Sequence, residues 1–131
     1  MSSMEGPGGA PDCVSGIPVI AADDDGWRSR IPINASYVQV PSYTTNADDW
    51  IVLPTGVLPG HTIKGWSTVA HEMRTEADSG IKINSEDCDG TKEAAIPATT
   101  LWEVVYVNST IGWILRAWDE LAAPITAIVP D

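Results

Sequence analysis

The sequence predicts an all-β protein, in which a compact antiparallel β-sandwich or barrel-like (jelly-roll-like) domain follows an extended N-terminal arm. Between residues 49 and 115, short apolar runs alternate with Gly, Pro, Asn or Asp, the pattern of strands joined by turns. Apolar residues make up 44% of the 131 residues, enough for one packed unit of about a hundred residues. The first 30 residues are too rich in Gly, Pro, Ser and Asp to add much to a core. We therefore divide the chain into a flexible arm, residues 1–30, and a β domain, residues 31–131.

Seven segments have the length and the boundaries of strands. They are residues 35–40, 50–54, 61–66, 80–84, 101–107, 112–115 and, between two prolines, 124–130. The proline-bounded segment suits a sheet edge or pairing with another subunit. Residues 108–110 predict a hairpin between their neighbours, and residues 116–121 predict a single helical turn or a corner. Pro59-Gly60 predicts a type II turn, with the segments before and after it paired across the turn.

Residues 68–74 fit either a strand or a helix. Val69, His71 and Met73 alternate with Ala70, Glu72 and Arg74, so in a strand the first set shares one face, which we expect to be the inner one. A strand is favoured because the nearest glycines on either side leave a window too short for a stable isolated helix.

Six Trp residues in a chain without Phe must supply most of the aromatic bulk. Each indole N–H needs a partner, so some of these side chains are expected at an edge or in an oligomer contact. Trp102, Trp113 and Trp118 belong to the strongest strand pair and its end. We expect these three to form the subunit core or an interface between subunits.

Eighteen acidic and seven basic residues give the chain a net charge of −11. The basic residues are scattered, whereas phosphate neutralisation needs clustered Lys and Arg, so nucleic acid is not expected as a partner. The sequence begins with no secretion signal and contains no apolar run of the roughly 18 residues that a membrane span requires. We expect a chain that is made in the cytosol, remains soluble and has no membrane partner.

No grouping of catalytic residues is recognisable. The Gly-x-Ser-x-Gly turn of serine hydrolases is absent, and His61 and His71 are both expected to be structural. No pair of Cys or His has the spacing of a zinc site, and glycine-rich phosphate loops are missing. We therefore expect a protein that is not an enzyme, with no metal and no cofactor.

Residues 85–92 form an acidic loop, after which the strand pattern resumes at residues 93–96. Asp87-Cys88-Asp89-Gly90 is similar to the centre of a calcium loop, but that alignment puts Ile96 where a bidentate Glu is required. An ordinary Asp-Gly turn is the expected structure. Cys13 and Cys88 are the only cysteines, and a disulfide between them is possible but not required.

The arm carries one small apolar patch between polar segments. It consists of Val14, Ile17, Val19 and Ile20. Such an arm could order itself on a neighbouring sheet or groove, or it could remain a disordered leader without a partner.

The order of several segments resembles that of small β domains in virion proteins of tailed phages. The resemblance rests on residues 50–54, Pro59-Gly60-His61-Thr62-Ile63, residues 80–84 and the closing pair 104–108 with 112–115. Such segments recur in capsid decoration (head cement) proteins and in fibre heads. The resemblance implies a homotrimer on the outer capsid surface of the virion, synthesised in the host cytoplasm, whose N-terminal segment contacts the major capsid protein. The chain departs from this group in its extra Trp residues and its acidic arm.

The leading hypothesis is a decoration protein that stabilises the shell by bridging capsid subunits. The arm patch would bind the capsid, so deleting residues 1–30 should abolish capsid binding and leave a folded trimer. The alternative is a fibre or spike-tip domain that recognises carbohydrate or a host receptor through exposed aromatic rings. The candidates for that role are Trp27, Tyr37, Tyr43 and Trp50.

Overall fold

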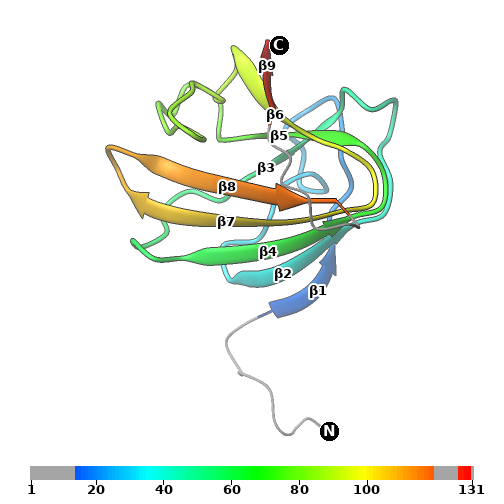
Figure 1. Cartoon of the computed structure of the whole chain (residues 1–131), viewed down its shortest axis with the longest axis horizontal. Coiled ribbons are helices and arrows are strands. Elements are labelled where there is room, and N and C mark those ends of the chain that lie inside the picture. Colours follow the sequence, from blue (N-terminus) through cyan, green and yellow to red (C-terminus); the bar gives the residue numbers. More distant parts are fainter. Residues whose placement is uncertain (1–13, 120–126, 131) are drawn as a thin grey trace, which may run out of the picture.

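The computed structural model describes residues 14–119 and 127–130, and this part of the chain is all-β, as predicted (Figure 1). Its strands are β1 (Val14–Pro18), β2 (Ala35–Val40), β3 (Trp50–Val52), β4 (Thr62–Ser67), β5 (His71–Arg74), β6 (Lys92–Ile96), β7 (Thr100–Asn108), β8 (Gly112–Trp118) and β9 (Ala127–Pro130). One sheet has five strands in the order β1-β2-β4-β7-β8, and the other has four in the order β3-β5-β6-β9. Two sheets of this kind match the expected sandwich-like domain.

Both sheets are mixed, where a purely antiparallel arrangement was expected. The pairs β1 with β2, β2 with β4 and β3 with β5 are parallel, and the remaining pairs are antiparallel. The predicted hairpin of β7 and β8 around residues 108–110 is confirmed. The proline-bounded C-terminal strand is also confirmed for residues 127–130, where β9 forms one edge of the four-stranded sheet.

Two strands cross from one sheet to the other at a shared corner. β4 continues into β5 through residues 68–70, and β6 continues into β7 through residues 97–99. On one side of the corner Ser67 pairs with Thr100, and on the other side His71 pairs with Ile96. A single long hairpin therefore bends through both sheets, as the curved ribbons in Figure 1 show. Residues 68–74 thus form a corner and a strand, and His71 and Met73 point inward as expected.

The core lies between the two sheets. Trp102 and Trp113 are both completely buried there. Other members of the core include Val38, Ile51, Leu53, Ile63, Met73, Ile83, Ile96 and Leu115. Trp118, the third of the predicted group, is only half-buried on the outer side of β8.

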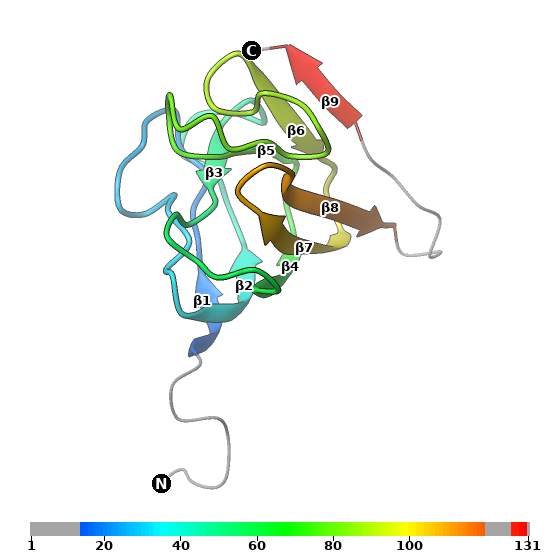
Figure 2. The ribbon, with the colours of Figure 1, turned by 90° about the vertical axis from the view of Figure 1, so that its left-hand side faces the viewer.

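Residues 14–30 belong to this fold, so the expectation that the first 30 residues contribute little to the core is wrong for them. β1 pairs with β2, and Val19, Ala21 and Ala22 are buried. Ala22 and Trp50 exchange two backbone hydrogen bonds, of 3.1 and 2.8 Å. Figure 2 shows the path of the backbone from β1 to β2. The small side chains of Ala21 and Ala22 leave room for the backbone to pair with Trp50 of β3. Residues 1–13, and with them Cys13, lie outside the described residues.

Three further expectations are wrong. Residues 80–84 form only isolated bridges rather than a strand, and β8 extends regularly to Trp118 instead of turning at residue 116. Pro59-Gly60 does form a turn, with a positive φ of 93° at Gly60, but the strands on either side do not pair. β3 lies in the four-stranded sheet and β4 in the five-stranded sheet, because each finds a parallel partner elsewhere.

The segment that was expected as a strand instead covers the exposed edge of β8. Trp113 N–H donates to the Lys82 carbonyl at 2.8 Å, and Asn84 N–H donates to the Trp113 carbonyl at 3.0 Å. The Asn84 side chain then takes the place of a further backbone amide: Oδ1 accepts from Leu115 N–H at 2.8 Å, and Nδ2 donates to the Leu115 carbonyl at 3.2 Å. The edge of β8 is thereby closed to pairing with another chain along these residues.

Replacing Asn84 by alanine is expected to lower the free energy of unfolding by about 2 kcal/mol. The variant loses both bonds to Leu115 and puts an alanine at a φ of +51°, where asparagine is better tolerated. Asn84→Gly separates the two effects, because glycine keeps the backbone angle and loses only the bonds. Urea unfolding of both variants measures the loss of unfolding free energy in each. Wild-type stability in Asn84→Ala would contradict the role of Asn84 at the β8 edge.

A candidate binding site at an apolar groove

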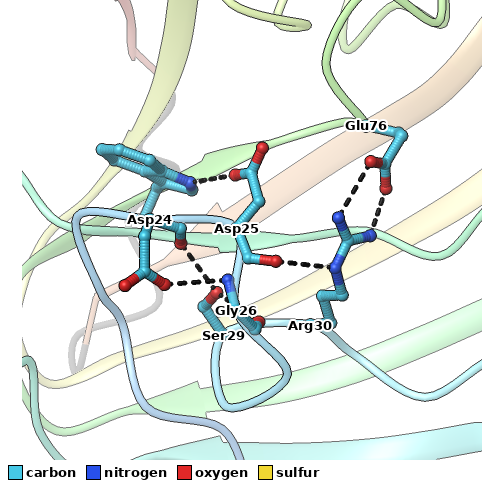
Figure 3. Close-up of polar contacts among 7 residues, drawn as sticks. Asp24, Asp25, Gly26, Ser29, Arg30 and Glu76 are labelled. Carbon is cyan, nitrogen blue, oxygen red and sulfur yellow. Dashed lines mark hydrogen bonds and ion pairs between the residues drawn. The ribbon is translucent and has the colours of Figure 1, made fainter.

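The loop between β1 and β2 is held in shape by its own polar groups. Asp24 Oδ1 accepts from Gly26 N–H at 2.8 Å. The buried Ser29 hydroxyl lies within hydrogen-bond distance of two carbonyls, those of Gly26 at 3.0 Å and Asp24 at 3.1 Å (Figure 3). The run of three aspartates, expected to be part of a flexible arm, therefore makes a compact turn.

Two long side chains anchor this loop to the body of the protein. Trp50 Nε1–H donates to Asp25 Oδ1 at 2.8 Å, and Arg30 Nε–H donates to the Asp25 carbonyl at 2.9 Å. The Arg30 guanidinium also forms a bidentate ion pair with the Glu76 carboxylate, in which Nη2 lies 2.9 Å from Oε1 (Figure 3). The hydrogen bonds from Arg30 lower the pKa of the Glu76 carboxyl below its ordinary value. The loop therefore has a fixed position on the fold.

Trp50 is occupied on its ring face as well as at its N–H. The Arg74 guanidinium carbon lies 3.6 Å from the Trp50 ring centroid. Arg74 Nε–H in turn donates to Oε1 of the buried Glu93 at 3.0 Å. These three side chains link β3, β5 and β6 across the four-stranded sheet.

Beside the anchored loop lies a groove of about 250 Å³ lined mainly by apolar side chains. Its lining residues are Ile17, Pro18, Ile20, Trp27, Arg28, Arg30 and Pro32. The Trp27 side chain is 81% exposed, and the Arg28 guanidinium carbon lies 5.6 Å from its ring centroid. A large aromatic ring held in the open beside an apolar groove is a typical anchor for a protein partner.

The four residues predicted to contact a capsid have different positions in the structure. Ile17 and Ile20 line the groove, whereas Val19 is buried in the protein's own core and is not available to a partner. Val14 opens β1, and its side chain is not among those described. From the sequence, Trp27 was a candidate for binding carbohydrate or a receptor under the alternative hypothesis, and the fold brings it to the same groove as Ile17 and Ile20. Arg28 and Pro32 of the groove gave no signal in the sequence.

The four aromatic candidates for sugar binding do not share one cavity. Trp27 lines the apolar groove, and Trp50 lines a different hollow of about 350 Å³ together with several carboxylates. Tyr43 is 40% exposed, and Tyr37 is half-buried with its hydroxyl 3.3 Å from Gln39 Nε2. A stacking platform made of all four residues is therefore not formed within one chain.

Three of the aspartates stabilise the local structure of their loops. Asp49 Oδ2 accepts from the backbone and hydroxyl of Thr44 at 3.0 and 2.9 Å and from Thr45 N–H at 2.7 Å. In the acidic loop, Asp87 pairs with Lys82 at 2.8 Å and Asp89 accepts from Gly80 N–H at 2.9 Å. Among the described residues no three His, Cys, Asp or Glu side chains are placed to hold a metal ion together. Burial raises the pKa of the free Cys88 thiol to about 11.

One serine and one histidine make a close contact at the corner between the sheets. Ser67 Oγ lies 2.6 Å from His71 Nε2, and Trp102 Nε1–H donates to the same Oγ at 2.9 Å. His71 Nδ1–H donates to the Glu72 carbonyl at 2.9 Å, so Nε2 carries no proton and accepts from the Ser67 hydroxyl. Ser67 and His71 are 0% and 1% exposed, so a substrate cannot reach them. Burial lowers the pKa of His71 to about 4.

His61, the second histidine considered as a base, takes no part in this contact. Its ring lies edge-on to Trp113, with the centroids 6.3 Å apart.

The comparisons with known proteins give no family assignment. No model of a protein family matches the chain, and no curated protein matches it. In the part of the chain that the structure describes, there is no helix long and apolar enough to cross a membrane.

Proposed function

We propose that this protein is a structural virion protein of the decoration type, which binds the outer surface of a phage head and stabilises the shell by bridging capsid subunits. The observation that carries the proposal is the groove with the exposed Trp27, formed partly by Ile17 and Ile20 of the patch assigned to capsid contact. The order of its sequence segments, which resembles that of small β domains of tailed-phage virion proteins, supports the same function. The partner is the major capsid protein.

The anchored loop makes the groove suited to firm binding. Asp25 is fixed by Trp50 and Arg30, so Trp27 is presented from a loop that needs little further ordering when a partner arrives. Binding to a surface that is already ordered avoids part of the entropy that association costs. Trp and Arg are also among the residues most enriched in interface hot spots.

The positive charges at the groove favour a partner surface that carries negative charge. The chain carries a net charge of −11, yet Arg28 and Arg30 stand together at the groove. Arg30 is paired with Glu76, and among the described residues no ion pair involves Arg28. An apolar capsid segment flanked by an acidic side chain complements this arrangement.

Several copies in one assembly would bind a repeating shell more tightly than one copy. Each linked copy raises the effective concentration of the others at neighbouring capsid sites, so weak single contacts suffice. The resemblance implies a homotrimer, and this oligomeric state remains a prediction that a mass measurement tests.

Trp27→Ala is expected to weaken cosedimentation with empty capsids at least tenfold, a loss of about 1.4 kcal/mol or more at an interface hot spot. Because Trp27 is 81% exposed, the free energy of unfolding should change by less than about 0.5 kcal/mol. Leu58→Ala is the matched control, since Leu58 is 79% exposed and does not line the groove. Wild-type capsid binding by Trp27→Ala would refute the groove as the capsid contact.

The structure shows that the role of the arm must be tested with a deletion shorter than residues 1–30. Deleting residues 1–30 removes β1 and the buried Val19, Ala21 and Ala22, so loss of binding would then report unfolding. Deleting residues 1–13 leaves these elements intact. If this shorter deletion binds capsids while Trp27→Ala does not, the groove carries the contact and the preceding residues do not.

A glycan array separates the decoration function from the alternative of a fibre or spike-tip domain. Trp27 is the observation that favours the alternative, because an exposed indole also stacks on sugar rings. A decoration protein should bind no glycan selectively. Selective binding that Trp27→Ala removes would favour receptor recognition instead.

A further inference from the structure

The outer face of the five-stranded sheet presents side chains from β2, β4, β7 and β8. On β4 the buried Ile63, Gly65 and Ser67 face the core, so the residues between them point outward. The same alternation holds on β7 around the buried Trp102 and Val104 and on β8 around Trp113 and Leu115.

Strand register arranges these outward side chains in three rows across the sheet. The first row is Gln39, Trp66, Leu101 and Trp118. The second row is Tyr37, Lys64, Glu103 and Arg116. The third row is Thr62, Val105 and Ile114. A charged row thus lies between two rows with large apolar side chains, of which Leu101 is 48% exposed.

Among the residues that the structure describes, no ion pair neutralises the charged row. Lys64 and Arg116 flank Glu103 on the neighbouring strands, yet none of the ion pairs found among the described residues involves any of the three. With two cations and one anion, the row carries a net charge of only about +1, on a chain whose net charge is −11. Two copies that meet at this face therefore bring little like charge together.

We propose that this face binds the same face of a second copy of the chain, around a two-fold axis that runs along the strands between β4 and β7. Such an axis places β7 of the partner over β4 and β8 of the partner over β2, and leaves each row facing the same row. Aligned packing of two sheets is one of the two common geometries for sheet faces.

The first two rows are complementary to themselves under this two-fold rotation. In the charged row, Lys64 of each copy meets Glu103 of the other, and Arg116 meets the ring of Tyr37. In the first row, Trp66 meets Leu101, and Trp118 meets Gln39. Opposite charges and large apolar groups therefore face each other twice, which a two-fold contact requires. This contact is independent of the apolar groove and does not rest on the capsid function.

The contact predicts a dimer, in contrast to the trimer that the resemblance implies. Sedimentation of the full chain should give twice the 14.0 kDa monomer mass. Lys64→Glu and Glu103→Lys should each raise the dissociation constant at least tenfold, because each places like charges opposite one another. Asp48→Lys, an exposed loop residue outside the three rows, makes the same change in charge as Glu103→Lys and should leave the dimer intact.

Mixing the Lys64→Glu and Glu103→Lys variants gives the decisive measurement. In a mixed dimer, both contacts between position 64 of one chain and position 103 of the other again join a carboxylate to an ammonium group. Heterodimers should therefore form at protein concentrations at which neither variant alone forms dimers. Within each variant chain, positions 64 and 103 still carry like charges. Dimer formation in the mixture therefore comes from contacts between the two chains and not from a restored ion pair within one chain.

Circular dichroism of each variant alone confirms that both are folded before they are mixed. A wild type that sediments as a monomer or a trimer would overturn the proposal. Folded variants that fail to form heterodimers would overturn it as well.

Discussion

Replacing Gly65 by alanine is expected to lower the free energy of unfolding by about 3 kcal/mol, a large fraction of the stability of a domain this size. Gly65 lies directly opposite Trp102 in the β4–β7 pair. A Cβ at this position would stand 2.0 Å from Cζ2 and 2.1 Å from Cε2 of the indole, so the ring must move. Movement of the ring would also weaken the hydrogen bond from the indole N–H to the Ser67 hydroxyl. Urea unfolding followed by Trp fluorescence measures the loss.

Two comparisons isolate the steric cause. Gly80→Ala meets no atom within 4 Å but places alanine at a φ of +72°, so it should cost only about 1 kcal/mol through backbone strain. Combining Gly65→Ala with Trp102→Leu should cost less than the sum of the two single changes, because the smaller side chain makes room for the new methyl group. If Gly65→Ala costs no more than Gly80→Ala, the close approach of Gly65 and Trp102 does not limit stability.

His71 is expected to make stability fall as the pH drops from about 6.5 to about 4. Burial lowers the pKa of His71 to about 4 in the folded protein, against its ordinary value of 6.5. Between these values the unfolded chain binds a proton that the folded chain does not, so acid favours unfolding. The full loss, present below pH 4, is about 3 kcal/mol for one histidine. Above pH 6.5 this residue makes no pH-dependent contribution.

The His71→Gln variant tests this expectation, because it cannot titrate in this range and can still accept from Ser67. The slope of unfolding free energy against pH between 4 and 6.5 should be smaller in His71→Gln than in the wild type, although carboxyl groups add to both slopes. Equal slopes in wild type and His71→Gln would contradict the role of His71.

Local patterns in the sequence predicted the strands whose alternation is regular and whose turns are short. The β7–β8 hairpin around residues 108–110, and the inward direction of His71, follow from such patterns. Residues 80–84 alternate in the same way, but Asn84 and Ser85 have positive φ values of 51° and 71°, which a strand does not allow. Alternation alone does not reveal the backbone angles at the end of a short segment.

Features that depend on contacts between residues far apart in the sequence could not be predicted from local patterns. Residues 14–30 have the composition of a loop, but their order comes from bonds to β2, Trp50 and Glu76. The apolar patch indicated Ile17 and Ile20 of the groove, and only the fold added Trp27 and Arg28 to them. The rows on the outer face of the five-stranded sheet likewise depend on the strand register, which determines which outward side chains are neighbours.

The hairpin that bends through both sheets also fixes when the protein can fold during its synthesis. β4 and β5 are made first, but their antiparallel partners, β7 and β6, follow only after the acidic loop has been made. A ribosome adds roughly 5–20 residues per second, so the β4–β7 and β5–β6 pairs can form only seconds after β4 has been made. The hairpin that joins the two sheets is therefore completed late, once the strand that holds Trp102 has left the ribosome.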